Sequence, residues 1–235
     1  MTYTIKVNDV IITVEKKKIK NMYLRVVPPK GQVKISAPHS ISREKIIQFA
    51  ESKIDWIKEK QKQTIINSEK SKKQELKYID GEKHYLWGKP YTLKIIKRTS
   101  KNKEVFIEDD NIYLPINSEN NSFEKREKAM NEFYRKEIKN KIPEVLEKCV
   151  NVVGKRPNEW RVKNMKTRWG TCNTRDKRIW LNLQLAKKPM DCLEYVTIHE
   201  LTHLYVPNHG KEFKEYMDIF CPNWKELKKK LNNKN

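Results

Sequence analysis

Alternating apolar and polar residues dominate the first forty positions of the chain. The segments Thr2–Val14, Tyr23–Val27 and Gly31–Ala37 follow this two-residue period, which is typical of half-buried β-strands. The sequence Pro-Pro-Lys-Gly at 28–31 has the residue types of a tight turn. It therefore predicts a hairpin between the last two strands.

A helical period follows, and a second β-rich block comes after it. Ser42 is a candidate N-cap for a helix that extends to about Gln63, and the polar segment 64–77 is either a linker or an exposed extension of that helix. The next block begins at Tyr85, with a turn around Gly88. Its expected strands are Thr92–Lys97, Lys103–Ile107 and Ile112–Pro115.

Helical periodicity returns from about Ser122 to Val153. Two strand-like segments, Trp160–Met165 and Arg178–Leu183, then flank an expected loop at Thr167–Lys177. The remaining expected helices are Asp191–Leu204, Lys211–Phe220 and Trp224–Leu231. No internal repeat is visible in the sequence. The pattern predicts an α+β fold with a β-rich N-terminal half, divided into residues 1–78, 79–120 and a C-terminal core at 121–235.

Composition excludes several classes of protein. No run of about 18 apolar residues occurs, so no membrane-spanning helix and no membrane partner are expected. The N-terminus lacks the apolar segment and cleavage site of a signal peptide. The four cysteines form no CxxC pair and are too few for a disulfide scaffold. We therefore expect a soluble, cytoplasmic protein.

The chain is strongly basic, with 51 Lys and Arg against 30 Asp and Glu and a formal charge of +21. Residues 1–100 carry 23 basic and 10 acidic side chains, and residues 101–235 carry 28 and 20. This charge raises the hypothesis of a nucleic-acid partner for the N-terminal half. No helix-turn-helix, zinc-finger or aromatic RNA-binding signature accompanies the lysine runs, and a solvated basic surface explains them as well.

Residues 199–203 read His-Glu-Leu-Thr-His, and three of the five histidines fall within positions 199–209. On a helix, His199 and His203 share one face, with Cβ atoms about 5–6 Å apart, so both imidazoles can bind one tetrahedral Zn²⁺. Glu200 projects beside this pair and can act as a general base on the attacking water. His39 and His84 are assigned no role.

A third ligand must come from beyond the helix. Pro207 is expected to stop the helix, so His209 can return to the metal and leave a fourth position open. Glu212 and Glu215 on the following helix are the alternatives. At the other end, Asp191 is a plausible N-cap, and Glu194 three residues later would complete a capping box.

Other interpretations of the motif are an exposed helix with incidental histidines and a structural zinc site completed by Cys221. The spacing of the three histidines matches that of metzincins. However, Val206 stands where those enzymes have a turn glycine, and no Met-turn follows. Cys172 is a poor candidate nucleophile because no further histidine lies at a suitable spacing.

Several blocks of the sequence resemble the YgjP-like metallopeptidase domain, which is related to SprT-like zincins. The C-terminal block is His-Glu-Leu-Thr-His-Leu-x-x-Pro-Asn-His-x-x-x-Phe at 199–213, and Arg-Trp-Gly-Thr-Cys at 168–172 lies upstream. Thr171 stands where the family usually has Ser. Leu-Asn-Leu-x-Leu at 181–185 and Leu-Arg-Val at 24–26 extend the likeness over most of the chain.

This resemblance implies a compact zincin-type core with an active-site HExxH helix and an edge strand beside it. It also implies that His199, His203 and His209 bind zinc, that Glu200 is the catalytic base, and that peptide bonds are hydrolysed.

The segment Arg168–Gly170 is a candidate support for substrate or oxyanion. Gly170 allows close approach of the backbone. Arg168 is interpreted either as an electrostatic aid to the oxyanion or a clamp for a substrate carboxylate, or as one half of an ion pair in the core. Trp169 is more simply explained by core packing, as is Trp180.

The sequence therefore predicts a zinc-dependent metallopeptidase acting on proteins or peptides. The alternative is a basic nucleic-acid-associated protein whose zincin domain acts on DNA-bound proteins or is inactive.

Overall fold

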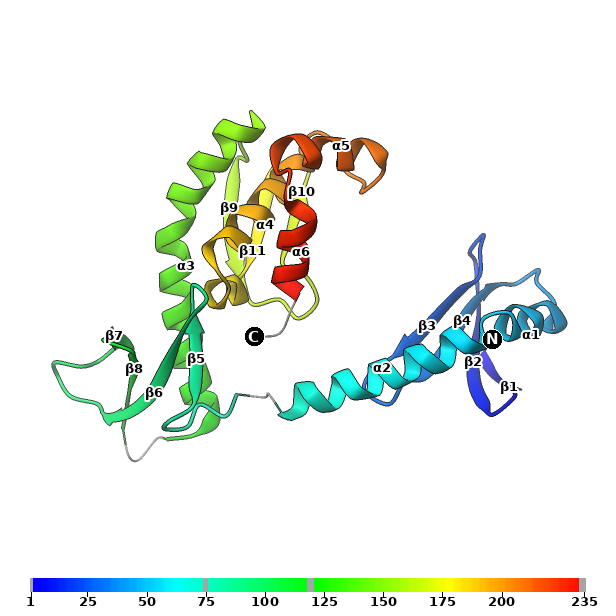
Figure 1. The fold of residues 1–235 in the computed structure, drawn as a ribbon, viewed down its shortest axis with the longest axis horizontal. Helices are drawn as coiled ribbons and strands as arrows, with labels where there is room; N and C mark the ends of the chain where they lie inside the picture. The colour runs from blue at the N-terminus through cyan, green and yellow to red at the C-terminus, as the bar shows by residue number, and fades with distance from the viewer. Residues whose placement is uncertain (1, 74–75, 118–120, 233–235) are drawn as a thin grey trace. The chain divides into compact units, whose positions relative to one another are not determined.

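The computed structural model describes residues 2–73, 76–117 and 121–232 (Figure 1). Within these ranges it has six α-helices and three β-sheets, so the expected mixed α+β class is confirmed. The chain divides into two compact units, Met1–Leu76 and Lys77–Asn235. The three regions expected from the sequence stay a prediction. None of the helices in the described ranges combines the length and the apolar character that crossing a bilayer requires.

The first unit is built on a four-stranded sheet in the order β1-β2-β4-β3. Its strands are β1 (Thr2–Val7), β2 (Val10–Lys17), β3 (Tyr23–Val27) and β4 (Gln32–Pro38). The antiparallel pairing of β3 with β4 confirms the predicted hairpin. The expected first strand is in fact two strands, because the chain turns at Asn8, which has a φ of 53°. β2 and β4 are parallel neighbours at the centre of the sheet.

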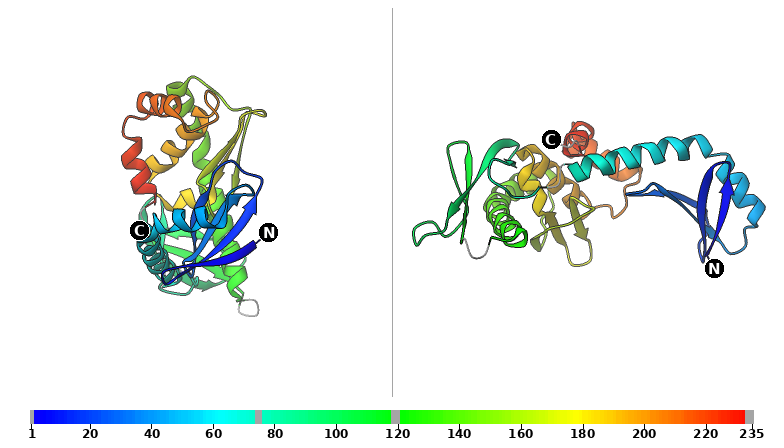
Figure 2. Two further views of the ribbon diagram at one scale, coloured as in Figure 1. Left: turned by 90° about the vertical axis from the view of Figure 1, so that its right-hand side faces the viewer. Right: turned by 90° about the horizontal axis from the view of Figure 1, so that it is seen from below.

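Two helices cover one face of this sheet (Figures 1 and 2). They are α1 (Arg43–Glu51) and α2 (Ile54–Lys73). The Ser42 hydroxyl accepts a hydrogen bond from the backbone N–H of Lys45, as expected of an N-cap. The single helix expected to about Gln63 is wrong, because Ser52 caps α1 and the chain restarts in α2, which continues through residues 64–73.

The second unit begins with a sheet of the same topology, in the order β5-β6-β8-β7. Its strands are β5 (Lys83–Leu86), β6 (Lys89–Lys97), β7 (Phe106–Glu108) and β8 (Asn111–Ile116). In both sheets two antiparallel hairpins are joined by a parallel central pair. The two sheets therefore share one topology although no repeat is visible in the sequence.

A long helix and a third sheet form the framework of the C-terminal part. The helix α3 (Phe123–Val153) begins at the expected N-cap Ser122. The sheet has the order β10-β11-β9, with β9 (Glu159–Lys163), β10 (Gly170–Asn173) and β11 (Arg178–Asn182). The prediction of an uninterrupted loop at 167–177 was wrong, because residues 170–173 pair with β11 as an edge strand. Four residues are too few to show a period.

Helix α4 (Met190–Thr202) is central in this part of the chain (Figures 1 and 2). It contacts α3, the strands β10 and β11, and the two last helices, α5 (Lys211–Phe220) and α6 (Trp224–Asn232). The 3₁₀ helix η2 (Leu183–Lys187) leads into it. Most of its residues are buried.

The predicted capping box of this helix was wrong. Pro189 occupies the N-cap position and makes no side-chain capping bond. Asp191 lies inside the first turn and pairs with Lys230, and Glu194 pairs with Lys148 on α3. Tertiary ion pairs therefore use the two carboxylates that the local pattern assigned to the cap.

Candidate metal centre

The C-terminal end of α4 carries the first two candidate ligands and the candidate base. His199 and Glu200 lie in its last turn, and His203 is the C-cap residue with φ −62° and ψ −18°. The helix ends before the expected Leu204, ahead of Pro207. His203 still has helical backbone angles, so it shares a face with His199, and their ring centroids lie 5.1 Å apart.

His209 returns from the turn after Pro207 to meet these two residues. One potential ligand atom from each of His199, His203 and His209 lies within 4.8 Å of the others. The Nε2 atoms of His199 and His209 are 2.9 Å apart. Phe213 of α5 is buried against all three rings. We call these three residues the histidine cluster.

The surroundings keep the histidine cluster neutral. Burial, reinforced by the other two histidines and by Lys228, lowers the pKa of His199 to about 3. Burial also lowers the pKa of His203 and of His209. The His203 Nδ1 lies 3.1 Å from the Val206 carbonyl oxygen, so Nδ1–H donates and Nε2 keeps its lone pair. Neutral imidazole is the form that binds a metal ion.

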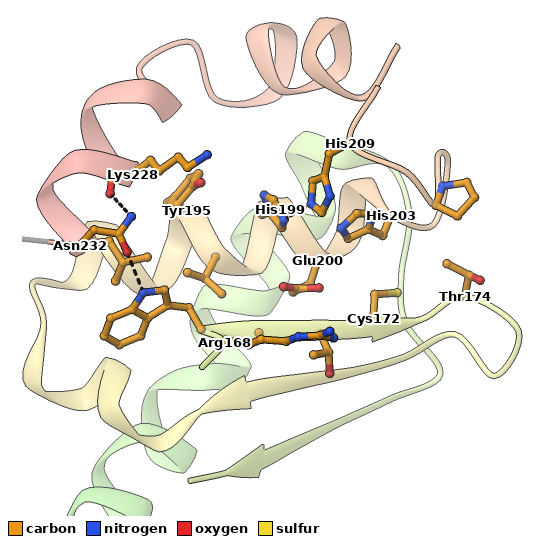
Figure 3. Close-up of a pocket in the computed structure, with 16 residues that line it drawn as sticks. Arg168, Cys172, Thr174, Tyr195, His199, Glu200, His203, His209, Lys228 and Asn232 are labelled. Carbon is orange, nitrogen blue, oxygen red and sulfur yellow. Dashed lines mark hydrogen bonds between the residues drawn. The ribbon is translucent and has the colours of Figure 1, made fainter. Parts of the chain in front are cut away.

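Glu200 lines the same cavity, and its side chain lies between α4 and β10 (Figure 3). Its side chain is buried, and burial raises its pKa to about 8, opposed by the positive charge of Arg168. A Cβ added to Gly170 would lie 2.5 Å from Oε1 of Glu200 and 2.8 Å from its Cγ. Only glycine therefore lets β10 pass this close to the carboxyl group, which agrees with the close approach expected at this position.

The family model described as "YgjP-like, metallopeptidase domain" matches residues 20–234 of the chain. The chain belongs to the YgjP-like metallopeptidase family. Two solved metallopeptidase zymogens resemble it over 38% of its length, each at 20% sequence identity. Abylysin of Pyrococcus abyssi is covered to 90% with a TM-score of 0.36, and jannalysin of Methanocaldococcus jannaschii to 92% with a TM-score of 0.34. No curated protein matches the chain.

In this YgjP-like domain, one buried asparagine holds the loop that precedes β10. Asn182 donates from Nδ2 to the carbonyl oxygens of Met165 and Arg168, and its Oδ1 accepts from the backbone of Met165 and Gln184. Its own N–H donates to the Trp169 carbonyl. The backbone that carries Arg168 and Gly170 is therefore fixed by a residue on the neighbouring strand.

The cavity in front of the histidine cluster has a volume of about 490 Å³. Arg168, Trp169 and Gly170 all line it, together with Cys172 and Tyr195. The side chain of Arg168 is exposed and forms no ion pair among the described residues, so the alternative of a core ion pair is wrong. Figure 3 shows it directed toward Glu200.

The tryptophans differ from the core packing expected of them. Trp169 is half-buried, and its Nε1 donates to Oδ1 of Asn232 on α6 at 3.2 Å. Trp180 is also half-buried, with the Arg161 guanidinium 5.4 Å from its ring centroid. Neither ring is fully buried.

The alternative ligands lie apart from the histidine cluster. Glu212 and Glu215 belong to no group of potential metal ligands among the described residues, and Glu215 pairs with Lys211. Cys221 is likewise outside the group. Burial raises the pKa of the Cys172 thiol to about 11, which agrees with its rejection as a nucleophile.

Sequence reasoning missed the contribution of α6. Lys228, Leu231 and Asn232 line the cavity although they are about thirty positions beyond the HExxH motif. No spacing rule connects them with α4, because the turn between α5 and α6 decides which face of α6 meets the cavity.

Proposed function

We propose that this chain is a zinc-dependent peptidase with a zincin-type core, in which the histidine cluster holds the metal ion and Glu200 is the general base. One observation carries the proposal. Three neutral imidazoles converge within 4.8 Å, and a buried carboxyl group lies beside them in one cavity. Membership of a metallopeptidase family gives this arrangement its chemical context.

The donor set suits zinc. Three imidazole nitrogens and no carboxylate form the ligand group, and the cavity leaves a further side open to water or substrate. The hydrogen bond from His203 Nδ1–H to the Val206 carbonyl orients that ring in the way second-shell partners orient zinc ligands. A bound zinc ion would polarise the scissile carbonyl and lower the pKa of the attacking water.

Glu200 moves the protons in this proposal. Its carboxylate accepts a proton from the attacking water as the new C–O bond forms, and later gives that proton to the leaving amine as the C–N bond breaks. The group must be ionised for the first step. The charge of Arg168 already favours the ionised form, and a divalent cation nearby favours it further.

The edge strand β10 supports a peptide as the substrate. Among the described strands only β11 pairs with it, along one edge, and Gly170, Thr171 and Cys172 of β10 line the cavity. An extended peptide can add to such an edge through main-chain hydrogen bonds. Protein or peptide substrates therefore fit the proposed reaction, whereas a nucleic-acid partner and a cytoplasmic location stay predictions.

The test combines metal analysis with proteolysis of an unfolded protein by the full chain. We expect about one zinc ion per chain. Glu200→Gln should keep the metal and lower kcat by about 10²- to 10⁴-fold, because it removes only the base. The matched control is Glu212→Gln, which changes an exposed carboxylate outside the cavity and should keep both metal and activity.

Full proteolysis by Glu200→Gln would contradict the proposed base. Loss of zinc from Glu212→Gln would make that carboxylate the third ligand in place of His209.

A further inference from the structure

The charged groups around the cavity are strongly unbalanced. Arg168 and Lys228 supply two permanent positive charges, and Glu200 is the single acidic residue among the lining side chains of the described chain. Neither cation forms an ion pair within 4 Å in the described residues. A bound divalent metal would add further positive charge. The cavity therefore favours an anionic occupant.

Lys228 reaches the cavity from a helix that is held in place. On α6, Leu227 and Leu231 are buried, and Lys230 pairs with Asp191 of α4. Asn232 accepts from Trp169 and donates from Nδ2 to the Lys228 carbonyl oxygen at 2.8 Å (Figure 3). These contacts on either side of Lys228 hold this part of α6, and with it Lys228, in place at the cavity.

Lys228 lines the same cavity as the three residues of the histidine cluster. Its side chain is exposed and uses the Trp224 ring, 5.9 Å away, as a cation–π partner. The three N–H donors of the ammonium remain available to a ligand in the cavity.

Tyr195 supplies a second donor on the same side. It lies one turn before His199 on α4, is 5% exposed and lines the cavity. A tyrosine hydroxyl can donate a hydrogen bond at neutral pH. Tyr195 and Lys228 both line this cavity (Figure 3). An ammonium and a neutral hydroxyl together suit a carboxylate, which accepts from both.

We propose that Lys228 and Tyr195 form a carboxylate-binding subsite beside the histidine cluster, so that the enzyme selects peptides that present a carboxylate there. This inference rests on the proposed peptidase function. The carboxylate comes either from an Asp or Glu side chain near the scissile bond or from the C-terminus of the substrate. A basic side chain at this place would meet like charge from Lys228 and is selected against.

The test measures peptide binding to the zinc-loaded Glu200→Gln protein by fluorescence anisotropy, and cleavage by the wild-type chain. The probes are one peptide sequence with Glu, Gln or Lys at each position flanking the scissile bond, each made as the C-terminal acid and amide. We expect the carboxylate-bearing peptides to bind about fivefold more tightly than their neutral counterparts, as for a partly exposed ion pair. Tighter binding of the Glu peptide than of the Gln peptide identifies a side-chain carboxylate as the ligand. Tighter binding of the C-terminal acid than of the amide identifies the C-terminus.

Lys228→Glu, introduced into both proteins, should remove this preference and shift it by about tenfold toward the Lys peptide. The matched control is Lys229→Glu, which makes the same charge change on the neighbouring residue of α6 outside the cavity lining and should keep the wild-type preference. Tyr195→Phe should weaken carboxylate binding without creating a preference for Lys.

Peptides that are bound and cut with no charge preference, or with a preference that survives Lys228→Glu, would overturn the subsite and leave the peptidase function standing. An equal shift caused by Lys229→Glu would attribute the preference to overall charge and would also overturn the subsite. If zinc-loaded protein neither binds nor cuts any of these peptides, the proposed function fails and the subsite fails with it.

Discussion

Two clusters of ionisable side chains lie in the Lys77–Asn235 unit, and they differ in one respect that decides their roles. The histidine cluster with Glu200 opens to a cavity. The second group, which we call the closed cluster, consists of Glu82, His84, Tyr134 and Lys187. Both contain groups whose pKa values are strongly shifted by burial.

The closed cluster satisfies its polar atoms internally. The His84 ring is 1% exposed, with Nε2 at 2.9 Å from Oε2 of Glu82 and Nδ1 at 3.4 Å from the Tyr134 hydroxyl. Glu82 also accepts two backbone N–H bonds of 2.7 Å, from Lys77 and Tyr78. Lys187 places its ammonium 4.8 Å from the Tyr134 ring centroid. These contacts connect β5, α3 and η2.

A shifted pKa therefore does not by itself indicate a functional site. In the closed cluster, lone pairs and N–H groups point at one another, and the network contributes to stability. In the histidine cluster, free lone pairs point at a shared space that solvent or substrate can enter. Access and convergence of donor atoms distinguish the two, and two pairs of variants and one pH profile test the distinction.

The largest effect is expected from removing one histidine of each cluster. His203→Ala should release the metal and abolish proteolysis, because two imidazoles are left to hold the ion. His84→Ala should keep the metal and lower the free energy of unfolding by about 1–3 kcal/mol, since Glu82 and Tyr134 lose a buried partner. Metal analysis and chemical denaturation measure the two outcomes, and metal loss from His84→Ala would erase the distinction.

A smaller effect is expected where β10 meets Glu200. Gly170→Ala places a methyl group within 2.5 Å of the Glu200 carboxyl and should displace it, lowering kcat by about 10²-fold with the metal retained. Gly210→Ala is the control, because a Cβ there meets no atom within 4 Å and its φ is −72°. Steady-state kinetics with metal analysis measures both. Equal activity of the two variants would show that close packing by Gly170 does not position the base.

The smallest effect concerns the stability of the closed cluster. Burial lowers the pKa of Lys187 from 10.5 to about 8, so between these pH values the unfolded chain binds more protons than the folded one, and stability rises with pH. In the wild-type chain this effect raises the free energy of unfolding by about 1 kcal/mol between pH 7 and 9, and Lys187→Met should lack that rise. Denaturation of both proteins across this range measures it, and parallel pH profiles would mean that Lys187 has an ordinary pKa.

Much of the local structure follows from short-range patterns in the sequence. Three features depend on residues within a few positions of one another: the hairpin of β3 and β4, the start of α3 after Ser122, and the proximity of His199 to His203. Period-2 alternation, N-cap chemistry and the helical repeat act over that distance. The same patterns failed where tertiary contacts compete, as when Asp191 pairs with Lys230 instead of capping α4.

The sequence by itself determined the identity of the candidate chemistry: an HExxH pair, a glutamate beside it and a histidine after the turn. Tertiary structure alone decided which surfaces surround that chemistry. It brought Gly170 against Glu200, Lys228 and Tyr195 into the lining of one cavity, and His84 into a closed network. The physical reason is that local backbone preferences fix neighbours along one element, whereas the packing of α6, β10 and α3 around α4 depends on side-chain shape and burial across distant parts of the chain.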